Sequence, residues 1–285
     1  MVKKTDLNDL LKEKEKKPKI FWTPEENETQ LIRIINPIDQ DWVYSITQHF
    51  ILQKNYICPT TLEQECPICN KGLELYKKYK AGTTTEQDSK LFSIIKRSQK
   101  HVVQILLRSK WEEFKKKYGS KFPTEKPNFD ENPVKIFFIG NSLWEKILFW
   151  AKPKTQGGRG LGEIWDNNSG RDIELIKQKS DAKKSLADFS MSGYADEKTK
   201  LAETEEDINY ILNVLVYKWD EVIKITPASQ LKTILADLEK IVYSGKNIED
   251  LEMSKVKESN NETSNAEVED DLEIENLLND IKKKG

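Results

Sequence analysis

The stretch Cys58-Pro-Thr-Thr-Leu-Glu-Gln-Glu-Cys66-Pro-Ile-Cys69 holds all three cysteines of this 285-residue chain. His49, one of only two histidines, lies nine residues upstream. Two thiolates at CxxC spacing can hold one ion from a tight turn, and a third thiolate and an imidazole complete a tetrahedral set. Soft sulfur ligands with one imidazole favour zinc. We therefore expect one structural zinc ion, held by His49, Cys58, Cys66 and Cys69.

Other interpretations of these cysteines remain open at this point. Cys66 and Cys69 can be a redox pair, or the three cysteines can be incidental. A redox pair needs neither Cys58 nor His49, and the βαβ pattern of a thioredoxin-like context is missing from the sequence. His101 is the other histidine and the alternative fourth ligand. A closed set of four ligands has no position for water, so the expected role of the metal is structural.

Short apolar runs on both sides of the cysteines predict strands. We expect them over residues 30–35, 42–47 with 49–52, 91–95, 102–107, 134–139 and 172–178. Helical periodicity is found over residues 71–80, 143–150 and 227–243. Many short strands interrupted by helices predict an α+β or mainly β fold, as one barrel or sheet with helical insertions. The zinc-binding subdomain, at about residues 49–80, is expected as an insertion in this single core.

Composition excludes several classes of protein. No window approaches the ~18 continuous apolar residues of a spanning helix, so a membrane protein is not expected. Residues 1–6, Met-Val-Lys-Lys-Thr-Asp, lead into charged residues, and we expect no secretory signal. An odd number of cysteines argues against a disulfide scaffold and for a reducing cytosol.

The net charge of −2 hides an asymmetry. Residues 258–285 contain nine acidic side chains and three lysines, a net charge of −6, and the rest of the chain carries +4. A mildly basic body with an acidic tail is common in proteins that bind nucleic acid or recruit partners. We expect three regions: an N-terminal arm over 1–17, a core over 18–253 and a disordered acidic tail over 254–285.

Cations and aromatic residues occur together in and beside the predicted strands. The cations are Arg33, Lys96, Arg97, Lys100, Arg108 and Lys110, and the aromatic residues are Phe92, Phe137, Phe138, Trp144 and Trp150. Cations neutralise phosphates and flat rings stack on unpaired bases, which is what single-stranded nucleic acid requires. The alternative is core packing, because Phe137 and Phe138 face opposite sides of a strand. Trp144 and Trp150 on a helix have the same alternative.

Six segments, in this order, resemble the single-stranded DNA-binding (helix-destabilising) protein family of T-even-type tailed phages. They are Lys3-Lys4-Thr5, Gln30-Leu-Ile-Arg33-Ile-Ile, the His49, Cys58, Cys66-Pro-Ile-Cys69 set, Phe92-Ser-Ile-Ile-Lys96-Arg97, residues 134–144 and residues 271–280. The cysteine spacing and the closing Leu-Leu-Asn-Asp of the tail are the most specific. At the place of the family's aromatic pair after Lys-Arg, this chain has His101-Val102.

The resemblance implies a zinc-containing OB-fold, a five-stranded barrel core with helical insertions. It implies non-specific, cooperative binding of single-stranded DNA in replication, recombination and repair, in the cytoplasm of an infected bacterium. The arm residues implied in self-association are Lys3, Lys4 and Thr5. The implied DNA contacts are Arg33, Phe92, Lys96, Arg97, Lys135, Phe137 and Trp144. The acidic tail would dock replication and recombination proteins, and no membrane is involved.

Two other functional hypotheses come from different classes. A zinc-ribbon adaptor of transcription or replication would bind protein partners through its acidic, leucine-containing tail. A metal-dependent nuclease or other enzyme is not expected, because the carboxylates are dispersed and no phosphate loop, HExxH motif or nucleophile–base pair is found. With His49 in the zinc site, His101 alone would remain as a general base.

Overall fold

The structure, a computed structural model, describes residues 20–52, 54–119, 121–178 and 189–244. Its strands are β1 (Phe21–Trp22), β2 (Thr29–Ile34), β3 (Val43–Ile51), β4 (Lys54–Ile57), β5 (Arg97–Leu107), β6 (Val134–Ile139), β7 (Ile173–Ile176) and β8 (Gly193–Tyr194). Its α-helices are α2 (Pro67–Lys80), α3 (Glu86–Ile94), α4 (Arg108–Tyr118), α5 (Asn141–Ala151), α6 (Glu205–Tyr210), α7 (Trp219–Val222) and α8 (Ala228–Tyr243). Short helical turns are η1 (Pro59–Leu62), η2 (Lys154–Gln156) and the π-turn η3 (Ile211–Leu215).

One long strand, β5, organises the sheet. Its N-terminal part pairs with β3, its middle with β6 and its C-terminal end with β2, all antiparallel. The order β1-β6-β5-β2-β7-β8 makes a mixed sheet, since β1 and β6 run parallel. In the described part of the chain the ladders form an open sheet, and closure into a five-stranded barrel is not seen there.

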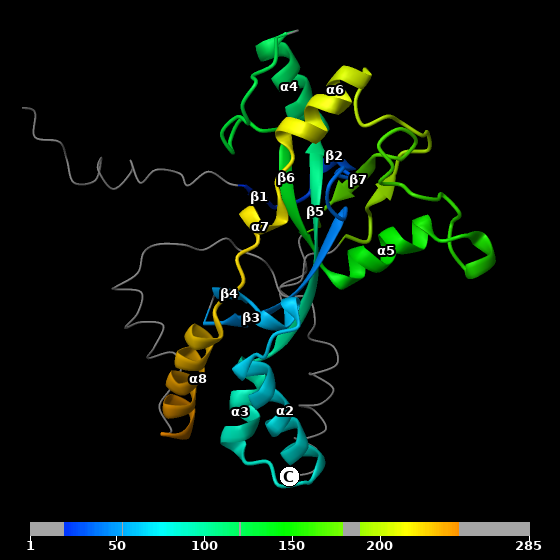
Figure 1. Cartoon of the computed structure of the whole chain (residues 1–285). Coiled ribbons are helices and arrows are strands. Elements are labelled where there is room, and N and C mark those ends of the chain that lie inside the picture. Colours follow the sequence, from blue (N-terminus) through cyan, green and yellow to red (C-terminus); the bar gives the residue numbers. More distant parts are fainter. Residues whose placement is uncertain (1–19, 53, 120, 179–188, 245–285) are drawn as a thin grey trace, which may run out of the picture.

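The central strands are buried on both faces, which explains their continuous apolar runs. Even-numbered residues of β5, such as Val102 and Leu106, pack into one core beneath α4, α6 and η3. The odd-numbered Val103 and Ile105 pack into a second core, which α5 covers with Leu143, Ile147 and Trp150. Figure 1 shows α4 and α6 together at one end of the sheet and α5 apart from them.

A third core forms a lobe at the other end of β5. The lobe contains Cys58, Cys66, the buried faces of α2 and α3, and α8 from far along the chain. Helix α8 contributes Leu231, Leu235, Leu238 and Val242 to it. The metal subdomain is therefore larger than the expected 49–80 span. It includes α3 and α8, and we call the whole set the zinc lobe, after the metal that the sequence leads us to expect.

Most of the expected elements are confirmed. Strands lie within or close to 30–35, 102–107, 134–139 and 172–178, and the two segments at 42–52 form one strand, β3. The three expected helices correspond to α2, α5 and α8. The strand expected at 91–95 is wrong. Thr85 and Asp88 form a capping box that starts a helix instead, and this helix continues to Ile94.

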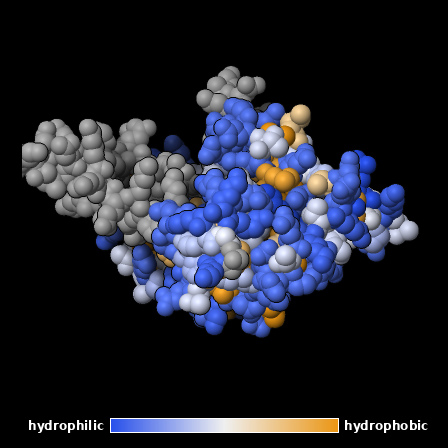
Figure 2. Space-filling model, turned by 90° about the horizontal axis from the view of Figure 1, so that it is seen from above, coloured by the Kyte–Doolittle hydropathy of each residue, from blue (hydrophilic) through white to orange (hydrophobic). Residues whose placement is uncertain are grey.

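Among the described residues, no helix combines the length and the apolar character that crossing a bilayer requires. The face of the molecule in Figure 2 is mostly hydrophilic, and its hydrophobic residues are scattered over it.

Candidate metal centre and nucleic-acid interface

The four expected metal ligands come from three adjacent structural elements. His49 lies on β3, Cys58 follows β4 and precedes η1, and Cys66 and Cys69 lie at the start of α2. Cys66 is the N-cap of α2, and Pro67 at the first helical position has the backbone angle that a helix start needs. The Cys69 amide donates to Cys66 Sγ at 3.5 Å, so the helix start itself builds the CxxC turn.

The ligand atoms of these residues converge. His49 Nε2 lies 3.4 Å from Cys66 Sγ and 3.5 Å from Cys69 Sγ, and the sulfurs of Cys58 and Cys69 are 3.6 Å apart. All four ligand atoms lie within 4.8 Å of one another. Zinc bonds of about 2.3 Å to sulfur and about 2.0 Å to nitrogen set tetrahedral ligands about 3.5–3.8 Å apart. The four residues therefore fit a metal ion such as zinc, and the alternative ligand His101 lies elsewhere.

Hydrogen bonds around the cluster orient its ligands. His49 Nδ1 lies 3.2 Å from the carbonyl oxygen of Lys96, which requires the proton on Nδ1 and makes Nε2 the ring nitrogen that faces the thiols. Thr60 Oγ1 donates to Cys58 Sγ at 3.0 Å. The hydroxyl and the carbonyl supply the polar contacts that a buried metal site needs outside its ligands.

The charges of the cluster are strongly coupled. Burial lowers the pKa of His49, but hydrogen bonds and charges from Cys58 and Cys66 outweigh burial and raise it to about 9. Hydrogen bonds with Cys66 and Cys69 lower the pKa of Cys58 far below its ordinary value, and hydrogen bonds with Cys58 and Cys66 raise the pKa of Cys69. A divalent cation would compensate these crowded thiolates.

The metal cluster adjoins a polar, open part of the sheet. In the β3–β5 ladder His49 is opposite Arg97, Thr47 is opposite Gln99 and Ser45 is opposite His101. Opposite residues share a face, and this face is the one that carries the α5 core further along β5. Ser45, Gln99 and Arg97 are exposed, and Thr47 is half-buried. We call these four residues the open β3–β5 face.

A column of four rings borders the open β3–β5 face. Trp165 stacks on Trp42 at 3.9 Å with 10° between the planes, Trp42 lies 5.5 Å from Trp144, and Trp144 stacks on His101 at 4.2 Å. Burial and the charge of Lys100 lower the pKa of His101, which favours the neutral form of its ring. The three tryptophans are half-buried. We call this set the aromatic column.

Sequence analysis identified only Trp144 of the column. Trp42 directly precedes β3 and Trp165 lies in an irregular segment, so no strand or helix pattern assigns either ring to this surface. His101 occupies the place of the expected aromatic pair, and its stacking on Trp144 provides an aromatic ring there.

Phe92, Lys96 and Arg97 follow one another along the chain from α3 in the zinc lobe to the first residue of β5. Phe92 is half-buried on α3 and packs against the lobe core. Lys96 is half-buried at the entry to β5, and Arg97 is exposed as the first residue of that strand. Within the part of the chain that the structure describes, Arg97 makes no ion pair. Arg97 therefore lies on the same sheet face as His101, on which Trp144 stacks, whereas Phe92 belongs to the lobe and Lys96 precedes the strand.

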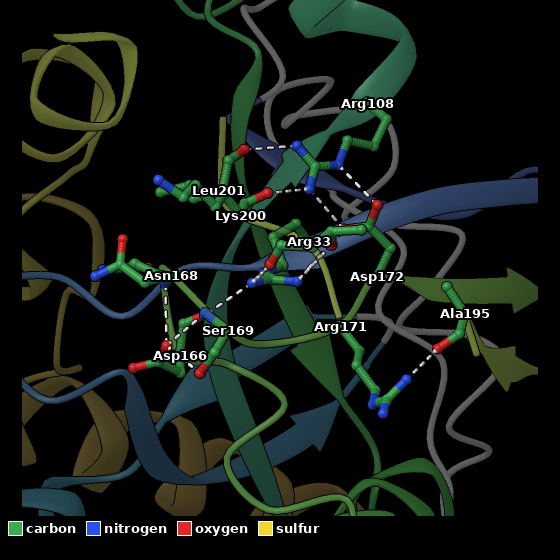
Figure 3. A network of polar contacts seen from close by, with 12 residues as sticks. Arg33, Arg108, Asp166, Asn168, Ser169, Arg171, Asp172, Ala195, Lys200 and Leu201 are labelled. Atoms are coloured by element: carbon green, nitrogen blue, oxygen red, sulfur yellow. Dashed lines mark hydrogen bonds and ion pairs between the residues drawn. The ribbon is translucent and has the colours of Figure 1, made fainter. Parts of the chain in front are cut away.

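Arg33 is placed on the opposite side of the sheet, fully buried. It pairs with Leu106, whose side chain belongs to the core beneath α4. Arg33 Nη2 donates to the carbonyl oxygens of Asp166 at 2.6 Å and Thr199 at 2.8 Å, and Nη1 lies 3.6 Å from Asp172 (Figure 3). Burial lowers its pKa to about 10 despite Asp172. Contact with DNA is not available to this guanidinium as placed.

The same network contains a second arginine. Arg108 Nε and Nη2 donate to the two oxygens of Asp172 at 3.0 and 2.7 Å, and its Nη1 donates to the carbonyl of Leu201 (Figure 3). Two guanidiniums therefore share one carboxylate and hold the segment around Lys200 against β2 and α4. The network is an internal brace.

Lys135 and Phe137 are also internal. The ammonium of Lys135, 7% exposed, donates to the carbonyl of Phe129, and burial lowers its pKa. Phe137, 4% exposed, packs edge-on against Trp22 in the core that α5 covers. Their expected DNA contacts are not supported by this placement.

Lys3, Lys4 and Thr5, the expected arm residues, and the acidic tail lie outside the described residues. Comparison of the sequence with protein-family models and with curated proteins gives no match.

Proposed function

We propose that this protein binds single-stranded DNA without sequence specificity, and that one structural zinc ion supports the binding surface. The observation that carries the proposal is the adjacency of the aromatic column, the open β3–β5 face and Arg97 on one side of the sheet. Along β5, Arg97 and His101 are about 14 Å apart, from about 3.4 Å per residue. Rings and cations at such separations suit an extended strand with unpaired bases.

Each group has a separate part in this binding. Arg97 and Lys96 neutralise phosphates, which releases counterions and makes the affinity salt-dependent. Trp144 and its column partners stack bases, worth on the order of 1–3 kcal/mol per base. Phe92 extends the contact toward the zinc lobe. Binding only the unpaired strand lowers duplex stability by mass action, without a chemical step.

Zinc bound by His49, Cys58, Cys66 and Cys69 supplies a structural cross-link between β3, the β4–η1 connection and α2. This cross-link is next to the proposed DNA surface, because His49 is opposite Arg97 in the ladder and donates its Nδ1 proton to the Lys96 carbonyl. We also propose that the core is an OB-fold. The way β5 pairs in turn with β3, β6 and β2 is compatible with a barrel strand.

The proposal also includes the terminal regions. An arm with Lys3, Lys4 and Thr5 contacts the next protomer along the strand and gives cooperativity. The acidic residues over 258–285 dock replication and recombination proteins and compete with DNA for the basic surface. The chain would act in the cytoplasm of a phage-infected bacterium, as the family resemblance implies.

The test is a tryptophan-fluorescence titration of the zinc-loaded full chain with oligo(dT) and with duplex DNA of equal length, at two salt concentrations. We expect strong quenching by oligo(dT), a weak response to duplex, and affinity that falls with salt. Arg97→Gln should lower the salt slope by about 0.7, the value for one phosphate contact on a single strand. Lys232→Gln, an exposed lysine on α8, is the matched control and should leave the slope unchanged.

A second candidate is a zinc-lobe adaptor that binds protein. It is favoured by three exposed hydrophobic residues on that lobe, Leu62, Leu73 and Tyr76. This candidate predicts zinc binding but no saturable response to oligo(dT). That result in zinc-loaded protein would refute single-strand binding.

A further inference from the structure

A glycine-rich turn follows α5 and has no part in the contacts proposed so far. Residues 156–162 read Gln-Gly-Gly-Arg-Gly-Leu-Gly, and Lys152 and Lys154 precede them. Figure 1 shows α5 and the turn after it extending away from the body of the molecule. Lys152, Lys154 and Arg159 are exposed, and no acidic residue occurs between 146 and 162.

Backbone hydrogen bonds hold this turn in one conformation. The Arg159 amide donates to the carbonyl of Phe149 at 2.9 Å, and the Gly160 amide donates to that of Lys152 at 2.7 Å. The Leu161 amide continues the series to Trp150 at 3.1 Å. The chain therefore folds back along the last turn of α5, which fixes where Arg159 lies.

The glycines are required by this path. Gly157, Gly160 and Gly162 have φ between +76° and +78°, which side chains rarely adopt. A Cβ on Gly158 would lie 2.2 Å from the Lys152 carbonyl oxygen. Glycine at these positions therefore allows the chain to fold back closely along α5.

The fold-back gathers the three cations. A Cβ on Gly158 would lie 2.5 Å from Lys152 Cβ, and one on Gly160 would lie 3.1 Å from Lys154 Cγ. The two glycines flank Arg159, so the two lysine stems lie on either side of the arginine backbone. Within the described ranges none of the three cations makes an ion pair. The result is an ordered, exposed group of three positive charges, which we call the α5 turn cluster.

We infer that the α5 turn cluster is a second phosphate-binding surface, which contacts the backbone of the same single strand beyond the aromatic column. Trp144 lies in the first half of α5 and Lys152 follows its end, so the helix connects the two surfaces. Eight residues of helical rise separate them by about 12 Å. The inference rests on the proposed function, and its ligand is the phosphodiester backbone.

The test compares the full-length triple variant Lys152→Gln, Lys154→Gln, Arg159→Gln with the wild type in the oligo(dT) titration. All three side chains are exposed and unpaired, so the variant should fold, as circular dichroism and thermal unfolding will verify. Three lost phosphate contacts should lower the slope of log affinity against log salt by about 2. Affinity at 0.1 M salt should fall at least tenfold.

The titration distinguishes failure of this inference from failure of the proposed function. If the wild type binds oligo(dT) and the triple variant has the same slope and affinity, the cluster is not a phosphate surface and the inference is overturned, while the proposed function stands. If the wild type does not bind oligo(dT), the proposed function itself has failed. Lys232→Gln again controls for the loss of a distant positive charge, and it should behave as wild type.

Discussion

Removal of the metal should release α8, although α8 provides none of the four metal ligands. Cys58 and Cys66 are buried in the same core as Leu231 and Leu238 of α8. A metal ion held by the four residues would join the strand side of this core to α2, and α2 with α3 forms the surface on which α8 packs. Loss of the ion leaves buried thiols without their common partner, and the surface beneath α8 loses its cross-link.

The free energy of α8 packing can be estimated from the side chains that α8 buries. Leu231, Leu235, Leu238 and Val242 are all at most 8% exposed. At about 1.5–3 kcal/mol for each buried aliphatic side chain, the docking of α8 is worth at most about 6–12 kcal/mol. Two polar contacts add to it, Lys71 with Glu239 at 3.0 Å and Tyr243 with Asp88 at 2.6 Å. The protection of the α8 backbone amides from hydrogen exchange therefore depends mostly on an intact zinc lobe.

The release of α8 is tested by hydrogen exchange and mass spectrometry on the same protein before and after a chelator removes zinc. The amount of zinc released per chain is measured in parallel. Peptides from 228–243 and from 67–80 should lose protection together. Peptides from α5 are the internal control, because Leu143, Ile147 and Trp150 pack on a different core. Cys58→Ser should reproduce the effect without a chelator. Unchanged exchange in α8 after release of one zinc per chain would refute the reasoning.

Three further predictions concern single side chains. Trp144→Leu, which removes the ring between Trp42 and His101, should weaken oligo(dT) binding by about 1–3 kcal/mol in the fluorescence titration, and wild-type affinity would contradict base stacking there. Gly170→Ala should lower the free energy of unfolding, measured in urea, by about 1–3 kcal/mol, because its Cβ would lie 2.6 Å from Arg33 Nη2 and 2.4 Å from the Ile164 carbonyl oxygen. An unchanged free energy of unfolding would show that the network around Arg33 can shift to accommodate the methyl group. Burial raises the pKa of Asp88, but hydrogen bonds from Tyr243 and Thr85 outweigh burial and lower it to about 2. The ionised Asp88 therefore stabilises the fold fully above the unfolded pKa of about 3.9, and this stabilisation, at most about 2.5 kcal/mol, is lost as the pH falls toward 2. The free energy of unfolding should therefore change less between pH 5 and pH 2.5 in Asp88→Asn than in the wild type.

The metal centre was predictable because its information is local. A CxxC turn needs only a helix start with Cys66 at the N-cap and Pro67 after it, and both are adjacent in sequence. Strand β6 and helix α8 were predictable for a similar reason, since a run of β-favouring residues and a helical stripe are patterns of neighbours. The helix α3 was missed because the apolar residues at 91–95 were weighed without the capping box at Thr85 and Asp88.

The sequence by itself determined the four candidate metal ligands, most of the secondary structure and the asymmetry of charge, because each of these depends on residue types at short spacing. The tertiary structure alone decided which cations and rings share a surface. In the sequence, Arg33 and Arg97 are both cations in or beside a predicted strand. The register of β5 with β2 and β3 buries Arg33 in the internal brace and leaves Arg97 exposed. Likewise, Trp42, His101, Trp144 and Trp165 form one column only because four separate segments meet there. Pairings between distant segments depend on the packing of whole elements, and no short stretch of sequence encodes them.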